Sequence, residues 1–130
     1  MKILLDTHIL LWTLTGSKKL SRKAKDLITD PDNEVYISII SPWEVELKHN
    51  KHPDRMPIDS STLLQYCKRA DFSYLSIRPH HIAQLSTLDS TIHADPFDRL
   101  LICQAKSEGM TLITCDNLIA QYNESFILKT

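Results

Sequence analysis

Short runs of apolar residues alternate along this chain with longer segments in which apolar and polar residues mix. Apolar runs rich in β-branched residues are typical of buried strands, and five candidate runs occur, at 3–5, 35–40, 74–77, 110–114 and 126–128. The longer segments are typical of helices and lie at 21–29, 42–49, 60–70, 80–88 and 96–108. Gly109 follows the last of them, where a glycine C-cap is expected.

This alternation predicts an α/β fold whose mainly parallel sheet is covered by helices on both faces. The chain shows no internal repeat, linker or low-complexity tract, so we expect residues 1–130 to form a single domain. An open sheet of this kind binds its ligands beyond the carboxyl ends of the strands. Candidate chemistry is therefore expected at that edge.

The composition narrows the choice of function. Hydrophobic residues make up 42% and charged residues 24%, as in a folded globular protein. The two glycines are too few for a P-loop or a dinucleotide-binding turn. Three cysteines form no CxxC pair, and the apolar start of the chain is interrupted at Asp6, so we expect reduced thiols in a cytoplasmic protein with no membrane contact.

Acidic residues follow three of the predicted strands and begin one of the predicted helices. Asp6, Glu44 and Asp116 come after the first, second and fourth strands, and Asp95 and Asp98 lie at the start of helix 96–108. Because parallel strands end at one edge, most of these acids are expected to gather there. Clustered carboxylates repel unless a cation neutralises them. Oxygen ligands without a cysteine or histidine set favour Mg²⁺ or Mn²⁺ over zinc.

Each acid also has a purely structural interpretation. Ser41 and Glu44 have the spacing of a capping box around Pro42, and Asp95 precedes a proline at a helix start. Asp6 and Asp116 are each placed to cap the helix that follows. Capping predicts a mixture of Ser, Thr, Asn and Asp at such positions, whereas a metal site requires acids. The repetition of acids at one edge therefore favours a metal site.

Four segments containing these acids form a longer pattern that runs in order from Lys2 to about Tyr122. They are Leu4-Leu5-Asp6-Thr7-His8, Ile39-Ile40-Ser41-Pro42-Trp43-Glu44, His93-Ala94-Asp95-Pro96-Phe97-Asp98-Arg99-Leu100-Leu101-Ile102 and Leu112-Ile113-Thr114-Cys115-Asp116. Together they resemble the successive motifs of PIN-domain proteins, and most closely those of the VapC-type ribonuclease toxins of bacterial toxin–antitoxin pairs.

The resemblance implies a three-layer α/β/α sandwich and an endoribonuclease that depends on Mg²⁺ or Mn²⁺. Such an enzyme hydrolyses RNA phosphodiester bonds with metal-activated water and leaves a 5′-phosphate and a 3′-hydroxyl. By motif, the catalytic and metal-binding acids are Asp6, Glu44, Asp98 and Asp116.

The resemblance also suggests supporting residues and partners. Thr7 and Thr114 are expected to orient water or an acid, and Asp95 is expected to cap its helix and to support the site behind the metal-binding acids. The family resemblance further implies a homodimer, and a cognate antitoxin that holds the toxin in check.

The charge balance agrees with an RNA substrate once the five acids are set aside. The whole chain has a formal net charge of −1, but 15 basic and 11 acidic residues remain outside the predicted site. Lys48, Lys51 and Arg55 follow Glu44 and are candidates for contacts with RNA phosphates. Lys48 also lies one helical turn after Glu44, so a simple ion pair is its alternative interpretation.

Two other functions are the alternatives to the nuclease. A receiver-like phosphoacceptor module requires paired acids after the first strand and a lysine near the fifth; here Asp6 stands alone, and no lysine lies between Met110 and Lys129. A non-catalytic PIN scaffold that binds RNA or protein remains the alternative. A zinc site is not expected, because His80 and His81, like the other paired histidines, are interpreted as surface residues.

Overall fold

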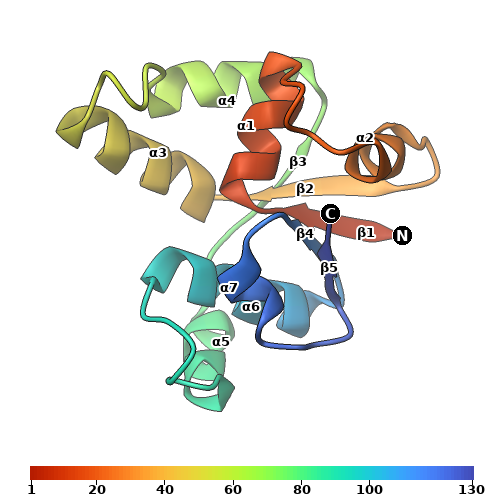
Figure 1. Ribbon diagram of the computed structural model, residues 1–130, viewed down its shortest axis with the longest axis vertical. Coiled ribbons are helices and arrows are strands. Elements are labelled where there is room, and N and C mark those ends of the chain that lie inside the picture. Colours follow the sequence, from red (N-terminus) through yellow and green to blue (C-terminus); the bar gives the residue numbers. More distant parts are fainter.

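The computed structural model describes residues 1–130 and has a five-stranded parallel sheet between two layers of helices (Figure 1). The strand order is β3-β2-β1-β4-β5, and every neighbouring pair is parallel. The strands are β1 (Lys2–Leu5), β2 (Glu34–Ser38), β3 (Ser73–Leu75), β4 (Thr111–Thr114) and β5 (Ile127–Lys129). The predicted three-layer α/β/α architecture is therefore confirmed.

The helices divide between the two faces of the sheet (Figure 1). One face is covered by α1 (Thr7–Thr15), α2 (Arg22–Thr29), α3 (Ile40–Lys51) and α4 (Ser60–Arg69). The other is covered by α5 (Pro79–Ala83), the 3₁₀ helix η1 (Gln84–Thr87), α6 (Pro96–Glu108) and α7 (Asn117–Ala120). None of these helices has both the length and the apolar character needed to span a bilayer.

Alternate residues of the central strands supply two separate hydrophobic cores. Ile3 and Leu5 of β1 belong to the core beneath α1–α4, whereas Leu4 belongs to the core beneath α6 and α7. All three side chains are fully buried. This alternation follows from the two-residue period of a strand, and it explains why a strand buried on both faces has an unbroken apolar sequence.

The order of the strands places the ends of β1 and β4 side by side. The chain runs outward from β1 to β2 and β3, then returns to form β4 on the other side of β1. Leu5 pairs with Ile113, and the Asp6 amide donates to the Ile113 carbonyl at 3.1 Å. Ligands of open α/β sheets bind where the strand order reverses in this way.

Two local predictions were wrong. The predicted strand 35–40 ends at Ser38, because the Ser38 hydroxyl accepts a hydrogen bond from the Ile40 amide at 3.0 Å and turns the chain into α3. The predicted helix 80–88 divides into α5 and η1. The helix expected after Asp6 is present as α1, although its bounds could not be predicted, since its apolar residues do not follow a one-sided helical pattern.

Candidate active site at the carboxyl edge of the sheet

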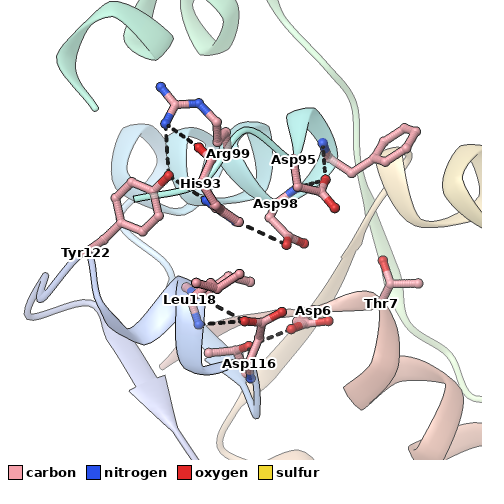
Figure 2. Close-up of polar contacts among 12 residues, drawn as sticks. Asp6, Thr7, His93, Asp95, Asp98, Arg99, Asp116, Leu118 and Tyr122 are labelled. Carbon is pink, nitrogen blue, oxygen red and sulfur yellow. Dashed lines mark hydrogen bonds and ion pairs between the residues drawn. The ribbon is translucent and has the colours of Figure 1, made fainter. Parts of the chain in front are cut away.

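The predicted acids lie at the junction of β1, β4, α3 and α6. In Figure 2, the carboxylate of Asp98 on α6 faces those of Asp6 and Asp116, which follow β1 and β4 on the opposite side. The negative charges of Asp6, Asp116 and Glu44 all raise the pKa of Asp98, as expected for groups that share one site. The structure therefore brings the four predicted acids together.

Asp6 and Asp116 are linked through the hydroxyl of Thr114. The Thr114 Oγ1 donates to Asp6 Oδ2 at 2.5 Å and accepts from the Asp116 amide at 3.0 Å. Asp6 also caps α1 by accepting from the His8 amide at 2.9 Å, and Asp116 caps α7 through the Leu118 amide at 2.7 Å. Both acids therefore cap helices as predicted, and Thr114 holds the carboxylate of Asp6 and the backbone of Asp116.

Asp6 is held in a dry environment. It is only 3% exposed, and this burial raises the pKa of its carboxyl above the usual range, although hydrogen bonds from Thr114 and His8 oppose the shift. Nearby Glu44 also raises the pKa of Asp6. The site thus keeps an acid buried beside another acid, which is costly unless a positive charge approaches.

Glu44 is held by side chains from two helices. Thr7 Oγ1 on α1 donates to Glu44 Oε1 at 2.8 Å, and Lys48 Nζ, one turn further along α3, contacts Glu44 Oε2 at 2.5 Å. Burial alone would lower the pKa of Lys48, but the hydrogen bond and the charge of Glu44 raise it overall. Lys48 therefore remains protonated and neutralises one acid of the cluster.

The predicted capping box at Ser41 is wrong. Helix α3 begins at Ile40, so Ser41 lies inside the helix, and its buried hydroxyl contacts Thr7 Oγ1 at 2.9 Å. Since Thr7 uses its one proton to reach Glu44, Ser41 is the donor in this contact. Glu44 therefore does not reach back to cap α3, and its structural interpretation fails.

The carboxylate of Asp98 contacts no lysine or arginine. Burial raises its pKa to about 8, and the charges of Asp95, Asp6, Asp116 and Glu44 add to the shift. Its carboxylate has one side-chain partner, His93 Nε2, at 3.3 Å from Oδ2. Helix α6 begins at Pro96 with Asp95 as its N-cap, so Asp98 lies in its first turn, where the helix dipole favours a negative charge.

Three residues behind Asp98 were not predicted from the sequence. His93 Nδ1 contacts the Tyr122 hydroxyl at 2.9 Å, and Arg99 donates to the same hydroxyl at 2.9 Å (Figure 2). The side chain of His93 is only 8% exposed. His93 lies within the motif that carries Asp98, which is a signal of its role, but nothing in the sequence connects Tyr122 with it.

Asp95 caps helix α6, as predicted. Its Oδ1 accepts from the amides of Phe97 at 2.9 Å and Asp98 at 3.2 Å. The residue is exposed, unlike Asp6 and Glu44, but its charge is close enough to raise the pKa of Asp98. The structure therefore places Asp95 at the rim of the cluster.

The donor chemistry of the cluster fits a hard divalent cation. It offers carboxylate oxygens from four residues, with Lys48 as the one cation in direct contact with an acid of this set. No three of these acids bring ligand oxygens within 4.8 Å of one another. The carboxylates therefore lie near each other without crowding, as expected for groups of like charge.

A second group of metal-ligating residue types lies elsewhere, at His80, His81 and Glu108. The interpretation of His81 as a surface residue was wrong, because its side chain is fully buried. His81 Nδ1 accepts from the Arg78 amide at 3.0 Å, so Nε2 carries the proton and donates to Glu108 at 2.8 Å. His81 has no free lone pair for a metal, and the group is an internal polar contact.

The three basic candidates lie near the end of α3. Lys48 contacts Glu44 as described, and Lys51 and Arg55 are both exposed. Arg55 lines a hollow of about 270 Å³ together with Lys48, whereas Lys51 does not line it. Lys48 and Arg55 therefore share one hollow, and Lys51 lies outside it.

Comparisons with known proteins agree with this arrangement. The chain is 27% identical over 120 residues to Ribonuclease VapC22 of Mycobacterium tuberculosis, covering 92% of this chain and 91% of that protein. Its fold is similar to a crystal structure of VapBC2 from Rickettsia felis bound to a promoter DNA fragment, with a TM-score of 0.69 at 16% identity, over 100% of this chain and 98% of that one.

A structure of VapBC-1 from nontypeable Haemophilus influenzae is also similar, with a TM-score of 0.66 at 15% identity, over 95% of this chain and 92% of that one. These two structural similarities concern the fold. The family model for the PIN domain matches residues 3–124, which contain every acid of the cluster. The chain therefore belongs to the PIN domain family.

Proposed function

We propose that this protein is an endoribonuclease that depends on Mg²⁺ or Mn²⁺ and acts as the toxin of a toxin–antitoxin pair. The observation that carries the proposal is the gathering of Asp6, Glu44, Asp98 and Asp116 at the carboxyl edge, where burial and then the charges of the neighbouring acids raise the pKa of Asp98 to about 8. Family membership and the similarity to a ribonuclease named VapC22 support it. The proposal assigns residues 1–130 to one nuclease domain, in agreement with a single sheet that joins both ends of the chain.

In this proposal Asp6, Glu44, Asp98 and Asp116 hold the metal. Their oxygen-only chemistry and their unneutralised charge fit Mg²⁺ or Mn²⁺. When bound, such an ion lowers the pKa of its water, orients the scissile phosphate and offsets the charge that develops on the phosphoryl oxygens.

The remaining residues of the site keep the acids in position. Thr114 fixes Asp6 and the start of α7, and Thr7 fixes one oxygen of Glu44. Lys48 neutralises the other oxygen of Glu44, which limits the repulsion that an approaching phosphate meets. No side chain of the cluster is required as a nucleophile.

The antitoxin partner is part of the proposal. The two solved structures named above are VapBC structures, and this chain shares their fold. A mainly apolar hollow of about 370 Å³ is lined in part by Trp43, Pro96 and Leu100. Trp43 directly precedes Glu44 in the sequence, and Pro96 directly follows Asp95. Trp43 is 51% exposed although it precedes the buried Glu44. Exposed apolar surface of this kind is typical of a protein-binding site. The homodimer stays a prediction, and sedimentation of the purified chain measures it.

The test is cleavage of a mixed tRNA and rRNA pool by antitoxin-free protein, with Mg²⁺, with Mn²⁺ and with EDTA. The informative variant is Asp6→Asn, because asparagine still caps a helix while the carboxylate is lost. Asp59→Asn is the matched control, since Asp59 caps α4 in the same manner through the Thr62 amide. We expect discrete products from wild type and Asp59→Asn, and none from Asp6→Asn or with EDTA.

Two results would contradict the proposal. Equal cleavage by Asp6→Asn and wild type would show that the nuclease activity comes from another site or from a contaminant. No cleavage by folded, metal-loaded wild type, together with retained RNA binding, would favour the non-catalytic scaffold.

A further inference from the structure

A basic hollow lies beside the acidic cluster. It has a volume of about 270 Å³ and is lined by His8, Lys48, His52, Arg55 and Met56. Its four polar lining side chains are all basic residues or histidines, and no acid lines it. A hollow of this chemistry favours an anion over a cation or an apolar group.

Two hydrogen bonds place this hollow next to the acids. Lys48 lines it and also contacts Glu44 Oε2 at 2.5 Å. His8 lines it from the first turn of α1, where its amide donates to Asp6 Oδ1 at 2.9 Å. The negatively charged acids and the positively charged hollow are therefore direct neighbours.

The wall of the hollow is built by specific contacts after the end of α3. The His52 carbonyl accepts from the amides of both Arg55 and Met56 at 3.0 Å. The ring of His49 contacts the Met56 carbonyl at 2.7 Å, and Met56 is only 9% exposed. These contacts hold Arg55 and His52 on a fixed turn, which distinguishes the hollow from a set of independent surface charges.

We propose that this hollow binds the RNA phosphodiester next to the one that is cleaved. The inference rests on the proposed function and names a substrate-binding site for it. Two consecutive phosphates of one strand require different neighbours here: the reacting phosphate meets the metal-binding acids, and its neighbour needs cationic donors. Arg55 and Lys48 supply charged donors, and His8 and His52 supply ring N–H donors. Such contacts position a strand without reading its bases.

The position of Lys51 sharpens the inference. Lys51 is exposed and lies on α3 like Lys48, but it does not line the hollow. Arg55 lies four residues further along the chain and does line it. A specific phosphate site therefore predicts a larger effect at Arg55 than at other exposed basic residues.

The experiment measures binding of a fluorescein-labelled single-stranded RNA with Mg²⁺ at several salt concentrations. All proteins carry Asp98→Asn so that the RNA stays intact. Arg55→Ala is compared with Arg69→Ala, an exposed arginine near the end of α4 outside the hollow. We expect Arg55→Ala to raise Kd about tenfold and to reduce the slope of log Kd against log salt by about 0.7, the value for one phosphate contact on a single strand.

Arg69→Ala is expected to leave Kd and slope within twofold of the parent protein, and Arg55→Lys to restore part of the affinity by keeping the charge. In proteins with Asp98 intact, Arg55→Ala is expected to raise KM for cleavage more than it lowers kcat. Wild type that cleaves RNA, together with identical Kd and slope for Arg55→Ala and Arg69→Ala, would overturn the phosphate site alone. Wild type that neither cleaves nor binds RNA would overturn the proposed function as well.

Discussion

Helix α6 carries two buried polar regions of opposite character. At its first turn, Asp98 lies among the acids of the candidate site. Near its other end, Gln104 and Glu108 contact His81 and residues of the sheet. Both regions remove polar groups from water, which costs free energy unless partners replace the lost water.

In the region around Gln104, donors and acceptors are matched. Ser38 Oγ donates to Gln104 Oε1 at 2.5 Å, and Gln104 Nε2 donates to the Ser76 carbonyl at 3.2 Å. His81 accepts from one side and donates to Glu108 from the other. Hydrogen bonds from His81 and His80 lower the pKa of Glu108, so its charged form is stabilised. These hydrogen bonds connect the sheet, α5 and α6.

In the region around Asp98, acceptors exceed donors. Four carboxylates share the site with one lysine, and burial together with the neighbouring acids raises the pKa of Asp98 to about 8. The same helix therefore stabilises a charged carboxylate at one end and disfavours one at the other. The two regions therefore differ in their balance of charge rather than in burial, and that imbalance makes Asp98 the candidate functional residue of this helix.

The largest difference between the two regions is expected in activity. Asp98→Asn keeps the size of the side chain but removes a proposed metal ligand, so we expect RNA cleavage to fall at least about 100-fold, beyond the usual effect of outer residues. Glu108→Gln removes a carboxylate from the same helix and keeps an acceptor for His81. Its cleavage rate is expected to stay within about twofold of wild type. Single-turnover cleavage of one RNA measures both variants.

An equal loss of cleavage in folded Asp98→Asn and Glu108→Gln would remove the distinction between the two ends of α6. Circular dichroism and thermal unfolding of both variants establish that they are folded.

The positions of the site acids could be predicted because each follows a strand or begins a helix. The pairing of Leu5 with Ile113 brings Asp6 and Asp116 together. The sequence predicts that they meet at one edge of the sheet, because both follow parallel strands. The matched region could not be predicted, because Ser38 and Gln104 are 66 residues apart and neither stands out in a local pattern. The bounds of α1 could not be predicted for a related reason, since only tertiary packing decides which of its apolar residues are buried.

The next effect is on stability, and it concerns the matched region. His81→Leu fills a similar volume but leaves the Arg78 amide without its acceptor and removes the shorter of the two histidine contacts of Glu108 Oε1. We expect the free energy of unfolding to fall by about 2 kcal/mol, which corresponds to a loss of roughly 8 °C in Tm for a chain of this size. Differential scanning calorimetry measures it. A Tm within 2 °C of wild type, or about half a kcal/mol, would mean that this polar region contributes no net stability.

A smaller effect is expected from pH in metal-free protein. The pKa of Asp98 is about 8 in the folded state, against a usual value of 3.8. Between these values the folded protein retains a proton that the unfolded chain releases, so the free energy of unfolding decreases as pH rises from 4 to 8. The contribution is fully present below pH 4 and is lost above pH 8.

The measurement compares wild type and Asp98→Asn from pH 5 to pH 8 in EDTA. Wild type is expected to lose on the order of 1 kcal/mol relative to the variant over this range, because solvent screens a partly exposed carboxylate. Mg²⁺ or Mn²⁺ at pH 8 is expected to raise the Tm of wild type more than that of the variant. If the free energy of unfolding changed with pH in the same way in both proteins, the raised pKa of Asp98 would be contradicted.

The smallest effect is expected at Tyr122, whose hydrogen bonds extend to the acidic cluster through His93. Its hydroxyl contacts His93 and Arg99, and His93 in turn contacts Asp98, so this chain supplies the only side-chain hydrogen bond that Asp98 has. Tyr122→Phe removes the hydroxyl and keeps the ring. We expect cleavage to fall about two- to tenfold, less than for Asp98→Asn, with a lower affinity for Mn²⁺ because His93 no longer holds Asp98 in one orientation. Titration of cleavage with Mn²⁺ separates this positioning role from a general loss of stability, since a merely destabilised protein shows a lower Tm with an unchanged midpoint of metal activation.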